Sequence, residues 1–168
     1  MDDLEKLLAI DAVKRLKATY FYAVDTKNYE LLATIYDDES IADFRGERDL
    51  KPGESPDKLA PVEQALAAGD NALAKGGDNI VALIREAVIP LVTVHHGHAP
   101  IIKVIGPDEV KGIWPMFDYV DNSRGAALKG YGHYHETYRK VGGRWILRHS
   151  VVTRLRTDGR NPVGFAQS

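Results

Sequence analysis

The stretch PLVTVHHGHAPIIKVIG, residues 90–106, marks the point where the character of the chain changes. Before it, apolar residues recur at helical spacing, and after it β-branched and aromatic residues dominate. The stretch also places three of the chain's six histidines, His95, His96 and His98, within four consecutive positions. These histidines could form a metal site, supply a base, or simply occupy a strand.

The N-terminal side of this stretch predicts helices. The first is the longest, because its apolar residues keep a 3.6-residue period after a cap at Asp2 or Asp3, without any Gly or Pro. We interpret Asp78 as the cap of the last helix before the stretch. We expect a first helix from residue 2 or 3 to near residues 25–28, helices over 29–36, 61–75 and 78–89, a weak strand over 40–44, and a surface loop over 45–61 that is rich in Gly, Pro and charges.

The C-terminal side predicts a meander of strands separated by turns that contain Gly, Pro, Asn and Asp. The expected strands cover 91–98, 100–105, 109–120, 127–141 and 144–157. Helices followed by a meander indicate the α+β class, with an antiparallel sheet packed on helices by one face. The tail, residues 158–168, is expected to be mobile or wrapped on a neighbour.

Composition limits the class of protein. A chain of 168 residues is expected to form one domain with a sizeable core. The net charge of −2, with scattered lysines and arginines, argues against nucleic acid or an anionic membrane as a partner. The absence of cysteine excludes disulfides, a thiol nucleophile and cysteine-ligated zinc. A charged N-terminus and the lack of a long apolar run lead us to expect a soluble, cytoplasmic protein.

Strand alternation divides the histidine cluster. Successive side chains of a strand point to opposite faces, so His95 lies on one face and His96 and His98 on the other. A second His-x-His pair, His133 and His135, follows on a later strand. The two pairs could together bind zinc, iron or copper, although half-exposed strand histidines are the more common case.

The other interpretation takes one histidine as a base. A neutral imidazole needs a partner on its second nitrogen, and a carboxylate serves best. Asp25 ends the apolar stretch of the first helix, where an unpaired carboxylate would be costly to bury, unless it simply ends the helix in water. Tyr20 lies five residues earlier and could donate a hydrogen bond to a developing oxyanion, or pack in the core.

Four segments in this order resemble the SnoaL-like branch of the nuclear-transport-factor-2-like superfamily, which includes scytalone dehydratase and a bile-acid dehydratase. They are YFYAVD (20–25), TVHHGHAPII (93–102), GIWPMFDY (112–119), and GYGHYHETY (130–138) followed by GRWIL (143–147). The resemblance covers most of the chain and implies one domain: a cone-shaped α+β barrel around an apolar pocket. Residues 46–89 would be an inserted loop and helical segment.

The resemblance also implies roles for three residues. Catalytic members use a His-Asp dyad, without a cofactor or metal, to remove a proton and expel a leaving group. The dyad histidine of the Thr/Ser-x-His pattern falls on His95, its acid on Asp25, and the helix tyrosine of the bile-acid enzyme on Tyr20. His95, Asp25 and Tyr20 are therefore indicated both by the chemistry of the residues and by the resemblance.

The chain departs from the bile-acid enzyme at two positions. Phe44, which cannot donate a hydrogen bond, stands where that enzyme has a second pocket tyrosine. That enzyme's last-strand arginine falls on Thr153 in an ungapped match, and alternation places the neighbouring Arg154 on the opposite face. We keep Phe44 and Arg154 as candidates for substrate binding.

Other residues complete the candidate site. Asp118 and His149 are candidates to line the pocket, with a sheet-spanning polar pair as the simpler alternative. Trp114 and Phe117 are expected in the core or in the apolar wall of a ligand cavity.

The leading hypothesis is a cofactor-independent lyase or isomerase that acts on a small, hydrophobic, cyclic compound, with His95 as general base. A non-catalytic binding or association module of the same fold is the alternative, and a metal-dependent enzyme using His96, His98, His133 or His135 is the third. The resemblance implies a homo-oligomer, either a dimer or a trimer.

Overall fold

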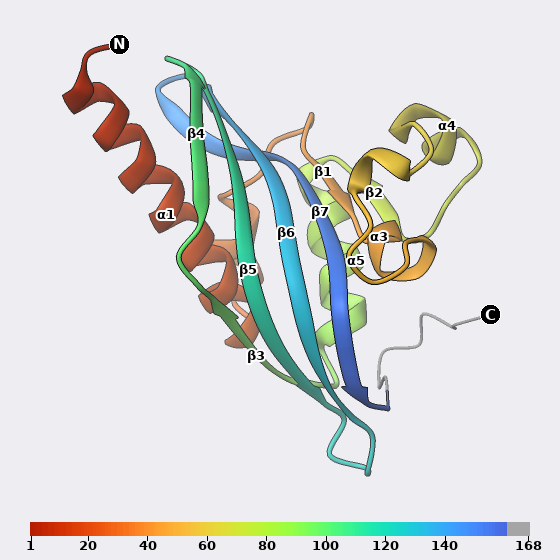
Figure 1. Cartoon of the computed structure of the whole chain (residues 1–168). Helices are drawn as coiled ribbons and strands as arrows, with labels where there is room; N and C mark the ends of the chain where they lie inside the picture. The colour runs from red at the N-terminus through yellow and green to blue at the C-terminus, as the bar shows by residue number, and fades with distance from the viewer. Residues whose placement is uncertain (161–168) are drawn as a thin grey trace.

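A curved sheet and the long helix α1 (Asp3–Asp25) determine where each candidate side chain lies (Figure 1). The computed structural model describes residues 1–160, and within them the sheet has seven strands. The α+β class predicted from the sequence is confirmed. The expectation for the tail falls outside the described residues from 161 onward, whereas residues 158 and 159 belong to the last strand.

The five strands predicted after residue 90 are all present. The strands are β1 (Ile41–Asp43), β2 (Leu73–Lys75), β3 (Val92–Gly97), β4 (Ile101–Gly106), β5 (Glu109–Asp121), β6 (Ala127–Val141) and β7 (Arg144–Gly159). Their order is β2-β1-β7-β6-β5-β3, and β4 also pairs with β5. The pair β1–β7 is parallel, whereas the other pairs of described strands are antiparallel.

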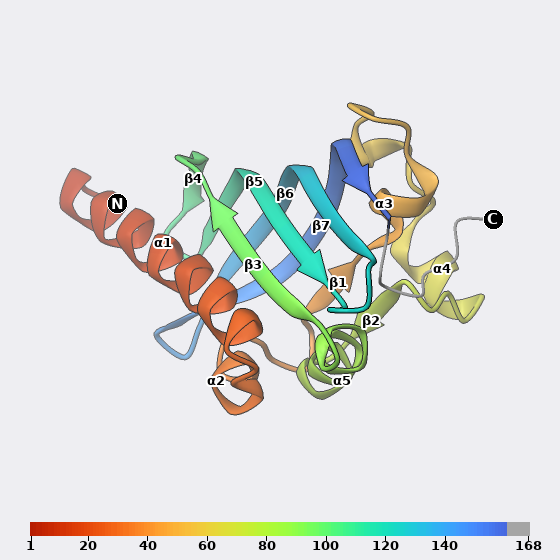
Figure 2. The same ribbon diagram turned by 90° about the horizontal axis from the view of Figure 1, so that it is seen from below.

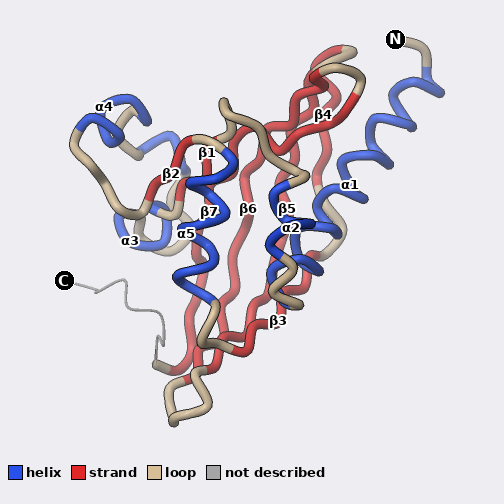
Figure 3. The backbone as a smooth tube through the Cα atoms, turned by 180° about the vertical axis from the view of Figure 1, so that it is seen from behind, coloured by secondary structure: helices blue, strands red, loops and turns tan. Residues whose placement is uncertain are grey.

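Helices cover one face of this sheet. The helices after α1 are α2 (Tyr29–Ala33), α3 (Arg45–Asp49), the 3₁₀ helix η1 (Pro56–Lys58), α4 (Val62–Ala67) and α5 (Gly77–Val88). Seen from behind, α2 and α5 lie in front of the strands (Figure 3), and the view from below shows α1 beside β3 and β4 (Figure 2). We call the helix-covered face the inner face and the uncovered one the outer face.

The sheet curves without closing. Register shifts between Tyr131 and Gly132 and between Thr137 and Tyr138 mark irregularities in the β6–β7 ladder, and such bulges bend a strand. The terminal strands of the order, β2 and β3, do not pair with each other. The cone-like curvature was therefore predicted correctly, but the structure is an open sheet and not a closed barrel.

The core lies between α1 and the inner face. It contains Val13 and Val24 from α1 together with Trp114, Tyr138 and Leu147 from the sheet, all of them buried. In the described part of the chain, no helix is long and apolar enough to cross a membrane.

Residues 45–75 depart from the sequence-based expectation. The expected surface loop contains α3. Arg45 at the start of this helix is buried, and its Nη2 lies 2.6 Å from Oδ2 of Asp43. The expected helix over 61–75 ends at Ala67, where Gly69 adopts a positive φ of 71°. Residues 73–75 instead pair with β1, because the sheet edge offers them hydrogen bonds that outweigh the helical preference of alanine.

The cap of α5 was also predicted wrongly. Gly76, with a φ of 88°, is the N-cap residue, and Asp78 lies inside the first turn. A residue with a positive φ turns the chain directly from β2 into the helix, so the helix begins earlier than the acidic residue suggested.

Candidate functional site

Asp25, the last residue of α1, reaches across to β3 and holds it at three points. Its Oδ1 lies 2.6 Å from Nδ1 of His95 and accepts a hydrogen bond from Oγ1 of Thr93 at 3.0 Å. Its Oδ2 accepts from the backbone N–H of His95 at 2.8 Å. The carboxylate therefore fixes both the ring and the backbone of His95.

This arrangement determines which nitrogen of His95 remains for chemistry. A carboxylate next to Nδ1 favours the tautomer in which Nδ1 carries the proton, so Nε2 keeps its lone pair. Burial by itself raises the pKa of Asp25, but hydrogen bonds from His95 and Thr93 and the charge of the imidazolium hold it below its usual value. Asp25 is therefore ionised at neutral pH, as a stabiliser of imidazolium must be.

The glycine in the TVHHGH motif allows α1 to approach β3. A Cβ atom on Gly97 would lie 2.5 Å from Cε2 of Phe21. The Phe21 ring stacks on the ring of His95, with centroids 6.0 Å apart and an interplanar angle of 15°. Gly97 therefore makes room for the helix that carries Asp25.

Two buried tyrosines lie next to this pair. The ring centroid of Tyr20 is 6.5 Å from that of His95 and 5.8 Å from that of Tyr134, which comes from the inner face of β6. Burial raises the pKa of both phenols. Both hydroxyls therefore remain protonated over the physiological range and can donate hydrogen bonds to a substrate oxygen.

A buried ion pair lies behind the tyrosines. Nζ of Lys17 is 2.6 Å from Oε1 of Glu136 and 3.3 Å from the ring centroid of Tyr134. Burial lowers the pKa of Lys17 to about 8, although Glu136 opposes this change. The sequence carried a signal for this pair, because Lys17 occupies the apolar stripe of α1 between Val13 and Tyr20.

A second polar group lies beside His95 on the inner face. Asp118 of β5 is the direct cross-strand partner of His95. Its two oxygens accept from Nη1 and Nη2 of Arg154 on β7, at 3.0 and 2.8 Å. The bridge crosses β6 above Gly130, where a Cβ atom would lie 2.0 Å from Oδ1 of Asp118. Glycine at this position lets the ion pair span three strands.

Arg154 also binds α3. Its Nη2 lies 3.1 Å from Oε1 of Glu47. Sequence reasoning missed Glu47, because residues 45–61 were expected to be a surface loop. Arg154 itself lies on the inner face. Thr153 lies on the outer face, where its Oγ1 is 3.1 Å from Nε2 of His135. The ungapped match had placed these two residues on opposite faces, and the structure makes Arg154 the inward-facing one.

The remaining candidates fall on different sides of the sheet. Trp114 is buried on the inner face, and Phe44, directly before α3, packs against the core. Phe117 lies on the outer face, because alternation turns it away from its neighbour Asp118. His149 also faces outward, since the adjacent Ser150 donates inward to Glu136. Phe117 and His149 therefore do not share the space of His95.

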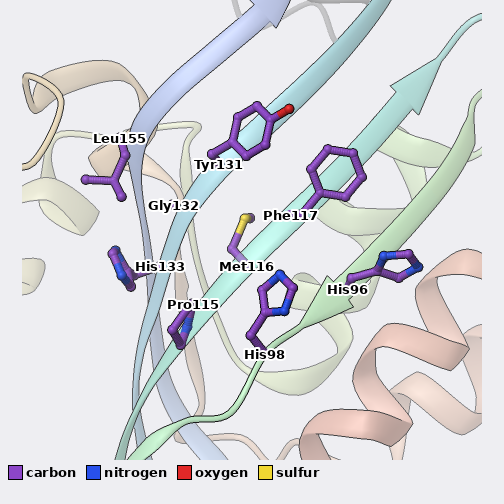
Figure 4. A pocket seen from close by; sticks show the side chains of 9 residues that line it. All are labelled: His96, His98, Pro115, Met116, Phe117, Tyr131, Gly132, His133 and Leu155. Carbon is purple, nitrogen blue, oxygen red and sulfur yellow. The ribbon is translucent and has the colours of Figure 1, made fainter.

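The outer face has its own hollow, of about 400 Å³, shown in Figure 4. The ring of Phe117 lies 6.0 Å from that of His96 and 5.3 Å from that of Tyr131. Nine residues line the hollow: His96, His98, Pro115, Met116, Phe117, Tyr131, Gly132, His133 and Leu155. Over residues 1–160, no three His, Asp or Glu side chains are grouped so that they could hold a metal ion.

Known proteins resemble this chain in fold and in part of its sequence. A hexachlorocyclohexane dehydrochlorinase of type 2 aligns with a TM-score of 0.75 at 17% identity, over 98% of this chain and 97% of the other. A candidate scytalone dehydratase of Novosphingobium aromaticivorans aligns with a TM-score of 0.70 at 18% identity, over 96% and 97%. At these identities the likeness concerns the fold.

A curated relative, the "Probable cyclase FGR4" of Gibberella zeae, is 32% identical over 78 residues, or 45% of this chain. The matched region spans 52% of that relative's length.

The model of the SnoaL-like domain family matches residues 5–151, from the first helix to the last strand. Most of the chain is therefore covered by one family model, and its fold is that of the family's dehydrochlorinase and dehydratase-like neighbours. The chain belongs to the SnoaL-like domain family.

Proposed function

We propose that this protein is a cofactor-independent lyase or isomerase that removes a proton from a small, hydrophobic, cyclic compound. The observation that carries the proposal is the contact of 2.6 Å between Nδ1 of His95 and the buried end of Asp25, next to the protonated phenol of Tyr20. This arrangement has the parts that proton abstraction needs: an oriented base, an anion that stabilises the protonated base, and a neutral donor.

In the proposed mechanism, Nε2 of His95 takes a proton from carbon, and Asp25 stabilises the imidazolium that forms. The electrons of the C–H bond form a double bond, as a leaving group departs or as the bond migrates. Tyr20 donates a hydrogen bond to the substrate oxygen on which negative charge develops. General-base catalysis of this kind contributes on the order of 10² to 10⁴-fold.

The names of the similar proteins agree with this reaction class. A dehydrochlorinase and a dehydratase remove hydrogen chloride and water, and a cyclase forms a ring. Each of the first two reactions starts with the loss of a proton and a leaving group from neighbouring atoms. These names support the reaction class, and the substrate of this chain is defined here only by its hydrophobic, cyclic character.

We also propose that the protein acts in the cytoplasm as a homo-oligomer, a dimer or a trimer, that binds neither nucleic acid nor membranes. The outer face of the sheet supports self-association, because Val92, Ile101 and Leu155 are at least half exposed there or at its margin. A second copy would cover this apolar surface.

A chromogenic elimination tests the proposed base without knowledge of the natural substrate. The probe, 5-nitrobenzisoxazole, loses its ring C–H proton to a base and opens to a coloured phenolate. We expect turnover by the purified protein, and a fall of on the order of 10²-fold in kcat/KM for His95→Ala. Asp25→Asn should also reduce kcat, because the imidazolium loses its counter-charge.

His98→Ala is the matched control, since His98 lies in the outer hollow and should leave turnover unchanged. Full activity of both His95→Ala and Asp25→Asn would refute the proposed base. Tight binding of the probe with no turnover by the unchanged protein would favour the non-catalytic alternative.

A further inference from the structure

Glu47 on α3 is not used by the mechanism above. It accepts a hydrogen bond from Arg154, which also binds Asp118, the cross-strand partner of His95. We propose that Glu47 is a second catalytic residue of this site, the general acid that protonates the leaving group while His95 removes the proton from carbon. This proposal rests on the proposed function, because it assigns the partner of the proposed base.

The geometry joins Glu47 to His95 through two residues. His95 faces Asp118 across the β3–β5 ladder, Asp118 binds both terminal nitrogens of Arg154, and Arg154 donates to Oε1 of Glu47 at 3.1 Å. The row therefore crosses the inner face from β3 to β7 and ends on α3. His95 lies at one end of the row and the Glu47 carboxyl group at the other, and the row joins them along the same face of the sheet.

If both acids of this row were ionised, two negative charges would face one positive charge. Asp118 and Glu47 share one guanidinium, and Asp118 takes the two-point contact and is buried. Glu47 has a single contact with Arg154 and keeps 36% of its side chain exposed. Of the two acids, Glu47 is therefore the one that can hold a proton and still reach a ligand.

The titration of Glu47 agrees with this role. Although part of the side chain reaches solvent, the protein packed around the carboxyl group raises its pKa, and the charge of Arg154 offsets only part of that rise. The charge of Asp118 raises the pKa further, whereas the His95 imidazolium lowers it. The net direction is a raised pKa, so Glu47 holds its proton to a higher pH than a free glutamic acid does.

The backbone fixes Glu47 in this position. Gly46, one residue earlier, lies so close to β7 that a Cβ atom there would be 2.2 Å from the carbonyl oxygen of Val152. This approach sets α3 against the edge of β7, beside Arg154. The packing of α3 against β7 therefore determines where Glu47 lies.

In the proposed step, Nε2 of His95 accepts the proton from carbon, and the C–H electron pair forms the new double bond. The bond from the neighbouring carbon to oxygen breaks, and the departing oxygen takes its electron pair together with the proton of Glu47, so that water leaves. Water then returns the proton from the imidazolium to the Glu47 carboxylate, which restores both groups.

Two probes that differ in their leaving group test the acid. Benzisoxazole and 5-nitrobenzisoxazole both lose the ring C–H proton to the base, and the oxygen leaves as a phenolate as the N–O bond breaks. The nitro group stabilises that phenolate, so its departure needs less help from an acid. We expect Glu47→Gln to lower kcat/KM about 10-fold more for benzisoxazole than for the nitro compound. Glutamine keeps an oxygen that accepts from Arg154.

Two control variants separate the possible outcomes. Glu63→Gln, on the exposed first turn of α4, should change neither rate, whereas Glu47→Asp, which keeps an acid, should restore part of the benzisoxazole rate. Equal losses on both probes, or no loss, in a Glu47→Gln protein that melts at the unchanged temperature would overturn the role of Glu47 and leave His95 as base. If His95→Ala keeps full activity on both probes, the proposed function itself fails.

Discussion

At the residue scale, Asp25 shows how a single carboxylate holds a histidine in place, because it contacts both the ring and the backbone of His95. It ends a helix, accepts three hydrogen bonds from β3, and carries a lowered pKa as a result. The same contacts that orient His95 therefore contribute to the stability of the folded chain.

The lowered pKa of Asp25 predicts an acid-sensitive contribution to stability. Its folded-state pKa lies below the usual 3.8, so the contribution is complete above that value and is lost as the pH falls through the folded pKa. We expect the difference in free energy of unfolding between the unchanged protein and Asp25→Asn to shrink when the pH falls from about 5 to about 2.5. Urea unfolding at several pH values measures this difference, and a difference independent of pH would contradict it.

Lys17 gives a second prediction at this scale. Lys17→Met leaves the Glu136 carboxylate buried without its counter-charge, which costs about 3–5 kcal/mol. A double variant that also carries Glu136→Gln should recover much of this loss, because no unpaired charge then remains. Lys14→Met, on the exposed side of the same helix, should change the free energy of unfolding by no more than about 0.5 kcal/mol. Chemical denaturation compares the variants, and equal effects of Lys17→Met and Lys14→Met would rule out a paired Lys17.

At the element scale, α3 is placed by a single close approach. In Gly46→Ala, the new Cβ would meet a backbone carbonyl at 2.2 Å, and backbone cannot move aside as a side-chain end can. We expect a loss of about 1–3 kcal/mol in the free energy of unfolding, together with displacement of Glu47 from Arg154. Thermal and urea unfolding measure the first effect. Gly106→Ala is the control, because a Cβ there meets no atom within 4 Å, and a similar loss in both variants would contradict the packing argument.

The elements also show what the sequence could predict. The helix over 3–25 and the five long strands follow from local periodicity and turn residues, and the alternation of β3 correctly separates His95 from His96 and His98. The strand over 73–75 could not be predicted, because its partner β1 lies more than 30 positions away and is itself only three residues long. Short edge strands are decided by tertiary pairing.

The candidate site likewise contains residues that the sequence could predict and one that it could not. Asp25, His95 and Tyr20 became candidates because each of them stands out locally, by an unusual position on its element or by a motif. Glu47 was hidden by a Gly- and Pro-rich segment that predicted a loop, although Gly46 is the residue that allows α3 to pack there. Phe117 was expected in the core or in the apolar wall of a cavity, and it lines the outer hollow because alternation turns it away from Asp118.

At the scale of the whole molecule, one face of the sheet carries the helices, and no helix of residues 1–160 covers the other (Figures 1 and 3). If a second copy covers the outer face, the protein should elute as a dimer or a trimer, and light scattering gives its mass directly. A Tyr131→Lys/Leu155→Lys double variant places charge in the outer hollow and should lower that mass. Val141→Lys, at the far end of β6, is the control, and a monomeric unchanged protein would contradict the proposal.

The parallel pairing of β1 with β7 has a consequence for synthesis on the ribosome. Ala42 pairs with Ser150, so the strand that leads into α3 has no partner on β7 until residues 144–159 have been made. At the usual rates of translation, the segment carrying Glu47 waits roughly 5–20 s for the segment carrying Arg154. Until then, the chain carries Asp25, His95 and Asp118 without the strand that holds Arg154. A chain released before β7 would therefore contain Asp25 and His95 but lack Arg154, the residue that joins Asp118 to Glu47.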